Sequence, residues 1–506
     1  MTKTNTFKKL LTAVSLCLIA LLVISSINLC APVKLYAQTT NAEITVFSWE
    51  DYLDRGYDSA LDASDVLRDR FSDAELTSDL LELFETKTGI KVNYYSFATN
   101  EEMYNELVKR PSAVDLICPS EYMIMKLKEE ELIKPFEMPQ NYVQYGSEYI
   151  KQVFEDLGLS DGTQTYAVGY MWGTMGLIYN ADKYSDSDFS SWSNLFNEQF
   201  NKKFTIKDSL RDSYIIGIAI VYEQELLEIK NQLSNGDINE TQYKESLLDI
   251  FNKVDEETVN KVGETLIELK SHLYGFEVDA GKNDLLTGKI DVNFAWSGDA
   301  VYSIKEAKDL KNLGYVIPEE GSNVWFDGFV MTKNADTENA LKFLDFICSP
   351  EVAVRNMEYI GYTSCIKGDF IFDYVKDSFN EPNGNVSVDL SYFFGNDKDY
   401  IVNVSNALDG NYMALYAQYA DRESILRCAV MNNFSQEDLL LVNEMWKKVK
   451  LITLSNLTIL FIVLSIAIVI GLLIVYKYRE KLFVRFFNKL DNKPKKYKII
   501  DKKQIK

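Results

Sequence analysis

Val324-Trp325-Phe326-Asp327-Gly328-Phe329 is an apolar, strand-like segment in the second half of this 506-residue chain. Residues i and i+2 of a strand lie on the same face, so Trp325 and Asp327 are expected to point the same way. An indole beside a carboxylate suits an organic cation, which stacks on the ring while the acid neutralises its charge. An ordinary half-buried strand, with a core tryptophan and a solvated acid, explains this segment alone equally well.

Strands and helices are predicted to alternate in the residues before this segment. We expect strands at residues 43–49, 90–97 and 114–118, and helices at residues 77–85, 99–109 and 122–132. Thr99 and Glu102 have the spacing of a capping box, which marks the start of a helix. Residues 54–74 are polar and acidic, and we expect them to form an inserted loop with at most a short helix.

The same alternation begins again in the middle of the chain. We expect a connecting strand at residues 169–180, strands at residues 204–207 and 291–296, and an extended segment at residues 316–331. Helices are expected between and after these strands, at residues 209–231, 238–273, 297–307, 335–348, 351–359 and 406–450.

Two α/β units joined by extended crossings predict an α/β protein with two lobes and a cleft between them. We expect lobe 1 to comprise residues 42–167 with 326–370, and lobe 2 to comprise residues 168–325 with 371–448. Ligands of such sheets bind beyond the carboxyl ends of the strands. Several polar and aromatic residues stand at predicted strand ends and are treated as one candidate site: Trp49, Ser120, Asp208, Asp212 and Trp296.

The charge of the chain is unevenly distributed. The formal net charge is −22, and residues 1–37 and 451–506 carry +4 and +9, which leaves −35 for residues 38–450. An acidic body with basic ends argues against binding to nucleic acid and suits the attraction of cations. A solvated acidic surface would have the same composition, so charge alone decides little.

Both ends of the chain have the pattern of membrane signals. Residues 1–9 are basic and residues 10–29 are apolar, as in a secretory signal or an uncleaved anchor, which we expect within residues 1–37. Residues 455–476 are long and apolar enough for a transmembrane helix, and residues 477–506 form a basic tail. By the positive-inside rule both termini are expected in the cytoplasm, with the acidic body outside the cell membrane.

The sequence lacks the usual signatures of an enzyme. His272 is the only histidine, it lies in a predicted helix near no candidate nucleophile, and no Cys or His spacing suits zinc. Asp208 and Asp212 could serve a hydrolase of glycosides, but two acids four residues apart on a helix more often form a solvated face. We therefore expect neither catalysis, nor a metal, nor a cofactor.

Five segments together resemble the spermidine/putrescine-binding family, the polyamine-binding proteins of bacterial ABC importers. The resemblance covers residues 43–450 and implies the two-lobed fold of the class II periplasmic binding proteins. The segments that carry it are Trp49-Glu50-Asp51-Tyr52, Pro119-Ser120-Glu121-Tyr122, Gly169-Tyr170-Met171-Trp172-Gly173-Thr174, Phe294-Ala295-Trp296-Ser297-Gly298-Asp299 and Trp325-Phe326-Asp327. The segment Ile360-Gly361-Tyr362-Thr363 also fits.

The resemblance implies a role for each residue that matches a ligand residue of the family. On lobe 1 these are Trp49, Tyr52, Ser120, Tyr122, Asp327 and Tyr362. Trp325, which matches the tryptophan of the family's Trp-x-Asp pair with Asp327, is the last residue of the adjoining lobe 2 segment. On lobe 2 they are Asp212, with Asp208 or Ser209 as its accompanying position, together with Trp296 and Asp299. Tryptophan and tyrosine faces would hold the methylenes of a polyamine, and the acids would pair with its ammonium groups.

The sequence departs from the family pattern in three places. Residues 54–74 are longer than the family pattern and follow Tyr52 closely, where they could cover the cleft. Asp212 is one methylene shorter than a Glu, which bears on the preference between putrescine and spermidine. A transmembrane span at residues 455–476 would replace the usual lipid anchor.

The expected function is therefore capture of a polyamine outside the cell membrane and its delivery to an ABC permease, whose ATPase subunits drive import. Three alternatives remain open: a binding protein for another organic cation such as choline, or for a peptide or metal complex; a membrane-anchored hydrolase; and a tethered sensor without a permease.

Overall fold

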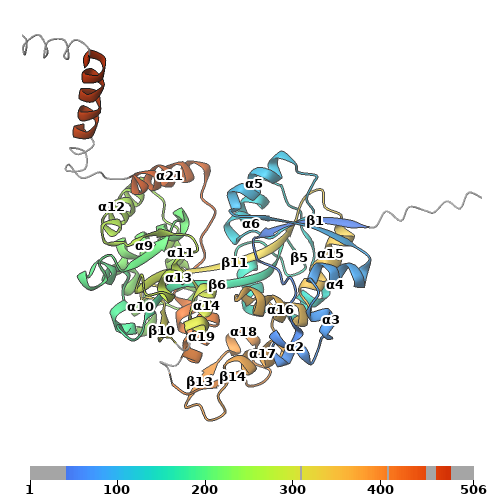
Figure 1. The fold of residues 1–506 in the computed structure, drawn as a ribbon. Coiled ribbons are helices and arrows are strands. Elements are labelled where there is room, and N and C mark those ends of the chain that lie inside the picture. Colours follow the sequence, from blue (N-terminus) through green and yellow to red (C-terminus); the bar gives the residue numbers. More distant parts are fainter. Residues whose placement is uncertain (1–41, 308–309, 407–409, 452–462, 480–506) are drawn as a thin grey trace, which may run out of the picture. The chain divides into compact units, whose positions relative to one another are not determined.

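The structure is a computed structural model that describes residues 42–307, 310–406, 410–451 and 463–479. Among these, the residues up to 443 form one compact unit and those from 444 belong to a second. The first unit contains two α/β lobes, as the alternation of strands and helices predicts (Figure 1).

The first lobe is built on three short parallel strands. β1 (Glu43–Trp49) lies between β2 (Lys91–Phe97) and β3 (Leu116–Ile117) and runs parallel to both. β11 (Ser322–Met331) joins this sheet antiparallel to β3. The helices of this part of the chain are α4 (Leu80–Thr88), α5 (Asn100–Lys109), α6 (Glu121–Glu129), α7 (Gln140–Tyr145), α8 (Glu148–Asp156) and α15 (Thr337–Ile347).

The second lobe repeats the parallel arrangement. β7 (Phe204–Lys207) lies between β8 (Gly275–Glu277) and β9 (Val292–Trp296) and runs parallel to both. The helices that follow these strands or lie between them are α9 (Leu210–Val221), α10 (Glu223–Asn235), α11 (Glu240–Phe251), α12 (Glu256–His272), α13 (Gly281–Leu286) and α14 (Ser297–Ala307). Short 3-10 helices precede β7 at Asp186–Phe189, Trp192–Phe196 and Glu198–Phe200.

Two long strands cross between the lobes. β6 (Ala167–Asn180) pairs antiparallel with β11 from Val330↔Ala167 to Val324↔Thr174, and its second half pairs with β9 and with β10 (Leu313–Val316). Every residue of β6 and β11 is buried, so the crossing lies inside the fold. Figure 1 shows the two strands running side by side from one lobe to the other.

The remaining elements are short or lie near the end of the chain. They are β4 (Phe136–Glu137), β5 (Gln164–Thr165), α16 (Pro350–Ile360), β12 (Thr363–Ser364), α17 (Asp369–Phe379), β13 (Val386–Asp389), α18 (Ser391–Phe394), β14 (Ile401–Val404), α19 (Gly410–Gln418), α20 (Arg422–Leu426), β15 (Cys428–Ala429) and α21 (Gln436–Lys450). β13 and β14 form a separate antiparallel hairpin, which the sequence did not lead us to expect.

Local capping explains where the helices at the candidate site begin. Thr99 caps α5 by accepting a hydrogen bond from the backbone N–H of Glu102 at 3.1 Å, as the capping-box spacing predicts. The Glu102 carboxylate accepts from the N–H of Ala98 rather than from that of Thr99. Ser209 caps α9 in the same way, by accepting from the N–H of Asp212.

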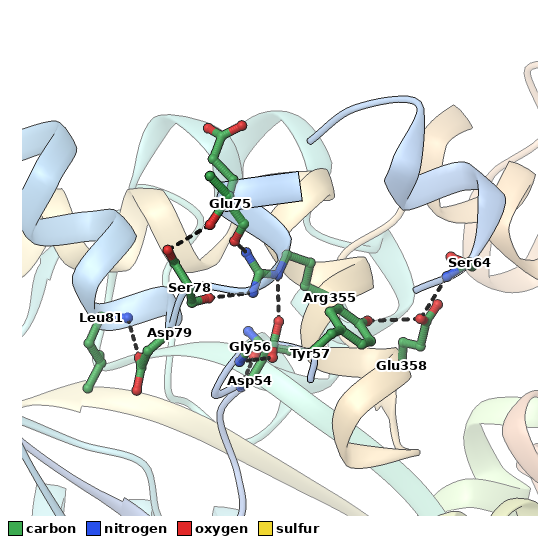
Figure 2. Close-up of polar contacts among 12 residues, drawn as sticks. Asp54, Gly56, Tyr57, Ser64, Glu75, Ser78, Asp79, Leu81, Arg355 and Glu358 are labelled. Atoms are coloured by element: carbon green, nitrogen blue, oxygen red, sulfur yellow. Dashed lines mark hydrogen bonds and ion pairs between the residues drawn. The ribbon is translucent and has the colours of Figure 1, made fainter. Parts of the chain in front are cut away.

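Residues 54–74 form more structure than the inserted loop we expected. They contain a 3-10 helix (Ala60–Asp62) and α2 (Asp65–Arg68), and α3 (Asp73–Leu76) follows. A buried ion pair between Asp54 and Arg355 ties this segment to α16. Figure 2 shows Arg355 reaching from α16 to Asp54 and to the backbone carbonyls of Glu75 and Ser78.

Some expectations differ from the structure or lie outside it. The helix predicted at residues 209–231 is two helices, α9 and α10, separated at Tyr222. The predicted signal or anchor at residues 1–37 lies outside the described residues, as does part of the predicted span at 455–476 and nearly all of the tail at 477–506. Residues 463–479 are helical, but within the described ranges no helix is both long and apolar enough to cross a membrane.

Candidate ligand-binding site

Asp327 lies at the centre of the candidate site and is bound by two hydroxyl groups. Tyr52 donates to its Oδ2 atom and Ser120 donates to its Oδ1 atom, each at 2.7 Å. The side chain is 6% exposed, and no ion pair to it lies within 4.0 Å among the described residues. Each carboxylate oxygen can accept more than one hydrogen bond, so Asp327 can still receive an ammonium group.

An irregularity in β11 places Asp327 beside Ser120 and Tyr52. The pairing between β11 and β6 shifts register between Asp327 and Gly328. Asp327 then forms an isolated bridge with Ser120, the residue that precedes α6. Asp327 in the middle of β11 therefore lies beside Ser120, which follows β3, at the point where the register of β11 shifts. Such register shifts commonly change the direction in which a side chain points.

Burial raises the pKa of Asp327 to about 6, against the hydrogen bonds of Tyr52 and Ser120, which lower it. Glu121, the next acid along the chain from Ser120, is also buried. Its carboxylate accepts from the N–H of Phe326 at 2.9 Å, and burial raises its pKa to about 8. Nearby positive charge would favour the ionised form of both acids.

Aromatic rings lie around Asp327. The Tyr362 ring lies edge-on to Trp325 at 5.2 Å and to Tyr52 at 6.0 Å between centroids. Tyr170 packs against Tyr52 and donates to its backbone carbonyl at 2.8 Å. Trp325 lies against Gly173, where a Cβ would approach its ring to 2.8 Å, so the glycine makes room for the indole. These contacts place Trp325, Tyr52, Tyr362 and Asp327 in one cluster.

Trp49 lies at the end of β1 and lines a pocket with Tyr52. Its ring packs on Phe97 at 4.7 Å between centroids. The pocket has a volume of about 240 Å³ and is lined by Trp49, Glu50, Asp51, Tyr52, Leu53, Arg55, Tyr94 and Ser96. Tyr52 links this pocket to Asp327, because it lines the pocket and also donates to the Asp327 carboxylate.

Tyr122 contacts Asn100, Glu101 and Arg211. Asn100 donates to the Tyr122 hydroxyl at 2.9 Å and to the Ser120 hydroxyl at 3.3 Å. The guanidinium of Arg211, from the start of α9, lies 3.6 Å from the centroid of the Tyr122 ring. Tyr122 therefore contacts Arg211 of α9, and the structure gives it no hydrogen bond to Asp327.

On the lobe 2 side, Trp296 and Asp299 surround the ammonium of Lys207. The Lys207 Nζ atom lies 4.1 Å from the Trp296 ring centroid and 3.1 Å from Asp299 Oδ2. It also lies 3.2 Å from Glu277 Oε1 and 2.8 Å from the carbonyl oxygen of Val278. Lys207, Glu277 and Trp296 end the three parallel strands β7, β8 and β9.

The two other predicted acids of lobe 2 differ in their surroundings. Asp208 is exposed, whereas Asp212 is half-buried in the first turn of α9. Burial raises the pKa of Asp212 above its ordinary range, although Ser209, Lys207 and Arg211 act in the opposite direction. No ion pair to Asp212 lies within 4.0 Å in the described part of the chain.

Tyr362 packs directly on Gly298 at the start of α14. Gly361, in the left-handed conformation with a φ of 83°, ends α16 and positions Tyr362 beside the start of α14. A Cβ on Gly298 would lie 1.3 Å from Cδ1 of Tyr362, so the ring lies directly on the glycine. Burial raises the pKa of Tyr362 well above its ordinary value, and the charges of Asp299 and Asp327 add to this effect. The structure thus brings Tyr362 near acids of both lobes.

Sequence reasoning missed Lys207, Asn100, Tyr170 and Arg211. Asn100 and Tyr170 position Ser120 and Tyr52, and their contacts join residues far apart in the chain. Lys207 lies directly before Asp208 at a predicted strand end, and that position was the one available signal. The described residues contain no group of three or more His, Cys, Asp or Glu side chains that could hold a metal ion.

Comparison with known proteins assigns the family. Residues 79–368 match the family described as bacterial extracellular solute-binding protein, and this match spans more than half of the chain. The chain belongs to this family. The aromatic and acidic cluster around Asp327 is therefore a candidate solute site, and the solute-binding family gives no support to the hydrolase alternative.

Relatives of this solute-binding protein include proteins named for polyamines. It is 26% identical over 287 residues to the spermidine/putrescine-binding periplasmic protein of Salmonella typhimurium, covering 56% of this chain and 72% of the relative. It is 26% identical over 305 residues to the putrescine-binding periplasmic protein PotF of Escherichia coli, covering 58% of this chain and 75% of the relative.

Solved structures agree on the fold. The putative spermidine/putrescine ABC transporter from Listeria monocytogenes superposes with a TM-score of 0.55 at 23% identity, covering 81% of this chain and 99% of the other. The substrate-binding protein PotD from Streptococcus pneumoniae gives a TM-score of 0.54 at 22% identity, with 81% and 98% covered. The solute-binding protein therefore has the two-lobed α/β fold expected from its sequence.

Proposed function

We propose that this solute-binding protein captures a polyamine outside the cytoplasm and delivers it to the permease of an ABC importer. The observation that carries the proposal is the geometry at Asp327, a buried carboxylate held by Tyr52 and Ser120 and enclosed by aromatic rings. A protonated amine would neutralise the acid, and the rings would hold the adjoining methylenes. The names of the relatives point to the same class of solute.

In this proposal the residues around Asp327 supply the first binding wall. Asp327 pairs with one ammonium group, while Trp325, Trp49 and Tyr362 supply aromatic faces worth about 0.5–2 kcal/mol each. Tyr52 and Ser120 keep the carboxylate in place by the hydrogen bonds described above. Tyr122 contributes through its contact with Arg211.

The residues of lobe 2 supply the opposite wall. Asp212 is the preferred second acid because it is half-buried and lacks a cationic partner within 4.0 Å among the described residues, whereas Asp208 is exposed. Trp296 and Asp299 belong to the same wall, with Lys207 between them. Binding to both walls would favour the closed form by differential affinity, and the closed form would dock on the permease.

The lobe boundaries and the membrane attachment are parts of the same proposal. Lobe 1 would comprise residues 42–167 with 326–370, and lobe 2 residues 168–325 with 371–448. The apolar residues within 1–37 and at 455–476, with the basic tail at 477–506, support export and retention at the cell membrane. Membrane fractionation of chains with and without residues 452–506 tests the retention.

Calorimetry of the full chain with putrescine, spermidine and choline tests the proposed function. We expect a binding heat with a polyamine and a much weaker one with choline, because choline carries one charge and cannot bridge two acids. No heat from either polyamine at millimolar concentration would contradict the proposal. Tighter binding of choline would favour the alternative of another organic cation.

A further inference from the structure

The ammonium group of Lys207 lies against Trp296 and Asp299, where we expected an ammonium group of the ligand. Its side chain is 1% exposed and lies on the face of Trp296, with Asp299 Oδ2 at 3.1 Å. A ring face and a carboxylate around one ammonium form the chemical surroundings that a protonated amine of a polyamine would need. The chain itself fills this position.

The Lys207 ammonium leaves nothing free for a second cation at that position. An ammonium has three N–H donors, and three acceptors lie within 3.2 Å of Nζ, from Asp299, Glu277 and Val278. Displacing Lys207 would leave its charge buried without partners, which is strongly unfavourable. Trp296 and Asp299 are therefore committed to an internal partner.

Two of the predicted acids remain to neutralise a ligand. Asp327 and Asp212 have no cation within 4.0 Å among the described residues, whereas Asp299 is paired with Lys207. Asp208 is exposed and is a poor partner for a ligand enclosed by the lobes. Two acids match two ammonium groups. Glu121, the other buried acid beside Asp327, already accepts from the N–H of Phe326, so a third ammonium would be buried without a carboxylate of its own.

We propose that Lys207 is a built-in ammonium group that fills a third cation position of the cleft, so that the protein prefers a linear diamine to a linear triamine. This inference rests on the proposed function, since it selects among polyamines at the same site. Lys207 acts here as a residue that determines specificity by occupying Trp296 and Asp299.

Replacing Lys207 by Met tests the inference, because Met has a similar volume and no charge. Calorimetry of the full chain with putrescine and spermidine gives the ratio of the two affinities. We expect the wild-type protein to bind putrescine more tightly than spermidine. In Lys207→Met the freed ring and acid can receive the third ammonium, and the ratio should move toward spermidine by at least about tenfold.

Lys207→Met leaves Glu277 and Asp299 without their shared cation and could therefore fail to fold, so a second variant is needed. Lys207→Met with Glu277→Gln removes one positive and one negative charge and leaves Asp299 as a single acid. The matched control is Lys282→Met, which also removes a positive charge near Asp299. Lys282 lies 3.8 Å from Asp299 but on the ring of Tyr302, so Trp296 stays covered and the affinity ratio should not change.

Three results would overturn the inference. They are a wild-type protein that prefers spermidine, an unchanged ratio in both Lys207 variants, and an equal shift in Lys282→Met. These results all require measurable polyamine binding, so they are distinct from failure of the proposed function, in which the wild-type protein binds neither polyamine.

Discussion

Asp327 is the residue on which ligand binding should depend most. It is buried, its hydroxyl partners are neutral, and no cation among the described residues compensates its charge. Asp327→Asn keeps the shape of the side chain and removes the charge. We expect the affinity for putrescine to fall by at least about thirtyfold. This corresponds to about 2 kcal/mol, the lower end of the binding free energy lost when one partner of a buried charge pair is removed.

The matched control for this change is Asp373→Asn, which removes a carboxylate from an exposed position of α17. Calorimetry on the two variants and the wild-type protein makes the comparison. An affinity in Asp327→Asn equal to that in Asp373→Asn would show that the ligand binds elsewhere.

The raised pKa of Asp327 gives a second prediction, because only the ionised carboxylate pairs with an ammonium. Its pKa is about 6 in the unliganded protein, so the affinity for putrescine should decrease below pH 6, by up to about tenfold per pH unit. Above pH 6 the contribution of Asp327 to the affinity for putrescine should become constant, since the carboxylate is already ionised. Binding measured at several pH values checks this.

Variants separate Asp327 from Glu121, whose pKa is raised to about 8. Asp327→Asn should abolish the step near pH 6, whereas Glu121→Gln should abolish any step near pH 8. A profile without a step near pH 6 in the wild-type protein would contradict the role of Asp327.

At the scale of single residues, the sequence could predict positions better than partners. The period of a strand predicted that Trp325 and Asp327 share a face. Asp327 accepts from Tyr52, Trp325 packs on Tyr362, and the two tyrosine rings pack on each other. The partner of Trp296 could not be predicted, because Lys207 reaches Asp299 across 92 residues of chain. Such contacts depend on which strand ends lie side by side, and spacing along the chain does not contain that information.

Arg355 links two elements and should dominate the stability of the segment at residues 54–74. It is fully buried, pairs with Asp54, and donates to the carbonyls of Glu75 and Ser78 at 2.9 and 3.0 Å (Figure 2). Burial raises the pKa of Asp54 even though Arg355 lowers it. Arg355→Met leaves that acid buried without a partner, and we expect a loss of about 3–5 kcal/mol in the free energy of unfolding.

Thermal and denaturant unfolding of the full chain measure this loss. Arg68→Met serves as the control, since Arg68 pairs with Asp65 on the surface of α2, where such pairs contribute about 0–1 kcal/mol. If Arg355→Met unfolds like Arg68→Met, the segment is not held by the buried pair.

At the scale of elements, the longer strands could be predicted because their apolar runs are bounded by turn residues. β1 and β7 have the predicted bounds, and β2 differs by one residue. The two-stranded sheet of β13 and β14 was missed because β13 has no buried residue, and its positions alternate only between half-buried and exposed. The break between α9 and α10 at Tyr222 was missed because no Gly or Pro lies within four residues of it on either side.

The contact between Tyr362 and Gly298 should control how the two lobes close. A methyl group at position 298 would overlap the Tyr362 ring, which comes from the other lobe. We expect Gly298→Ala to keep both lobes folded but to prevent their full approach, so that putrescine binds at least about tenfold more weakly. Small-angle scattering with putrescine should show a larger radius of gyration than in the wild-type protein.

Gly275→Ala is the matched control, because a Cβ at that position has no atom within 4 Å. It should bind putrescine and close as the wild-type protein does. Unchanged binding and scattering in Gly298→Ala would show that the lobes do not need this contact to close.

At the scale of the whole molecule, the sequence predicted two lobes and a site at strand ends. The order of the strands agrees with two lobes: β11 pairs with β3 of the first lobe, β6 pairs with β9 of the second, and β6 and β11 pair with each other. The way in which the lobes meet could not be predicted, because Tyr362 and Gly298 each look like ordinary turn or helix-start residues in the sequence. Their contact depends on how distant parts of the chain pack together, which the spacing of residues along the sequence does not show.

A crystal structure of the protein with putrescine tests the central claim most directly. We predict one amino group of the ligand within about 3 Å of the Asp327 carboxylate, the range of a charge-assisted hydrogen bond. The adjoining methylenes should lie against Trp325 and Tyr362. Putrescine bound elsewhere, with Asp327 contacting only Tyr52 and Ser120, would contradict the account.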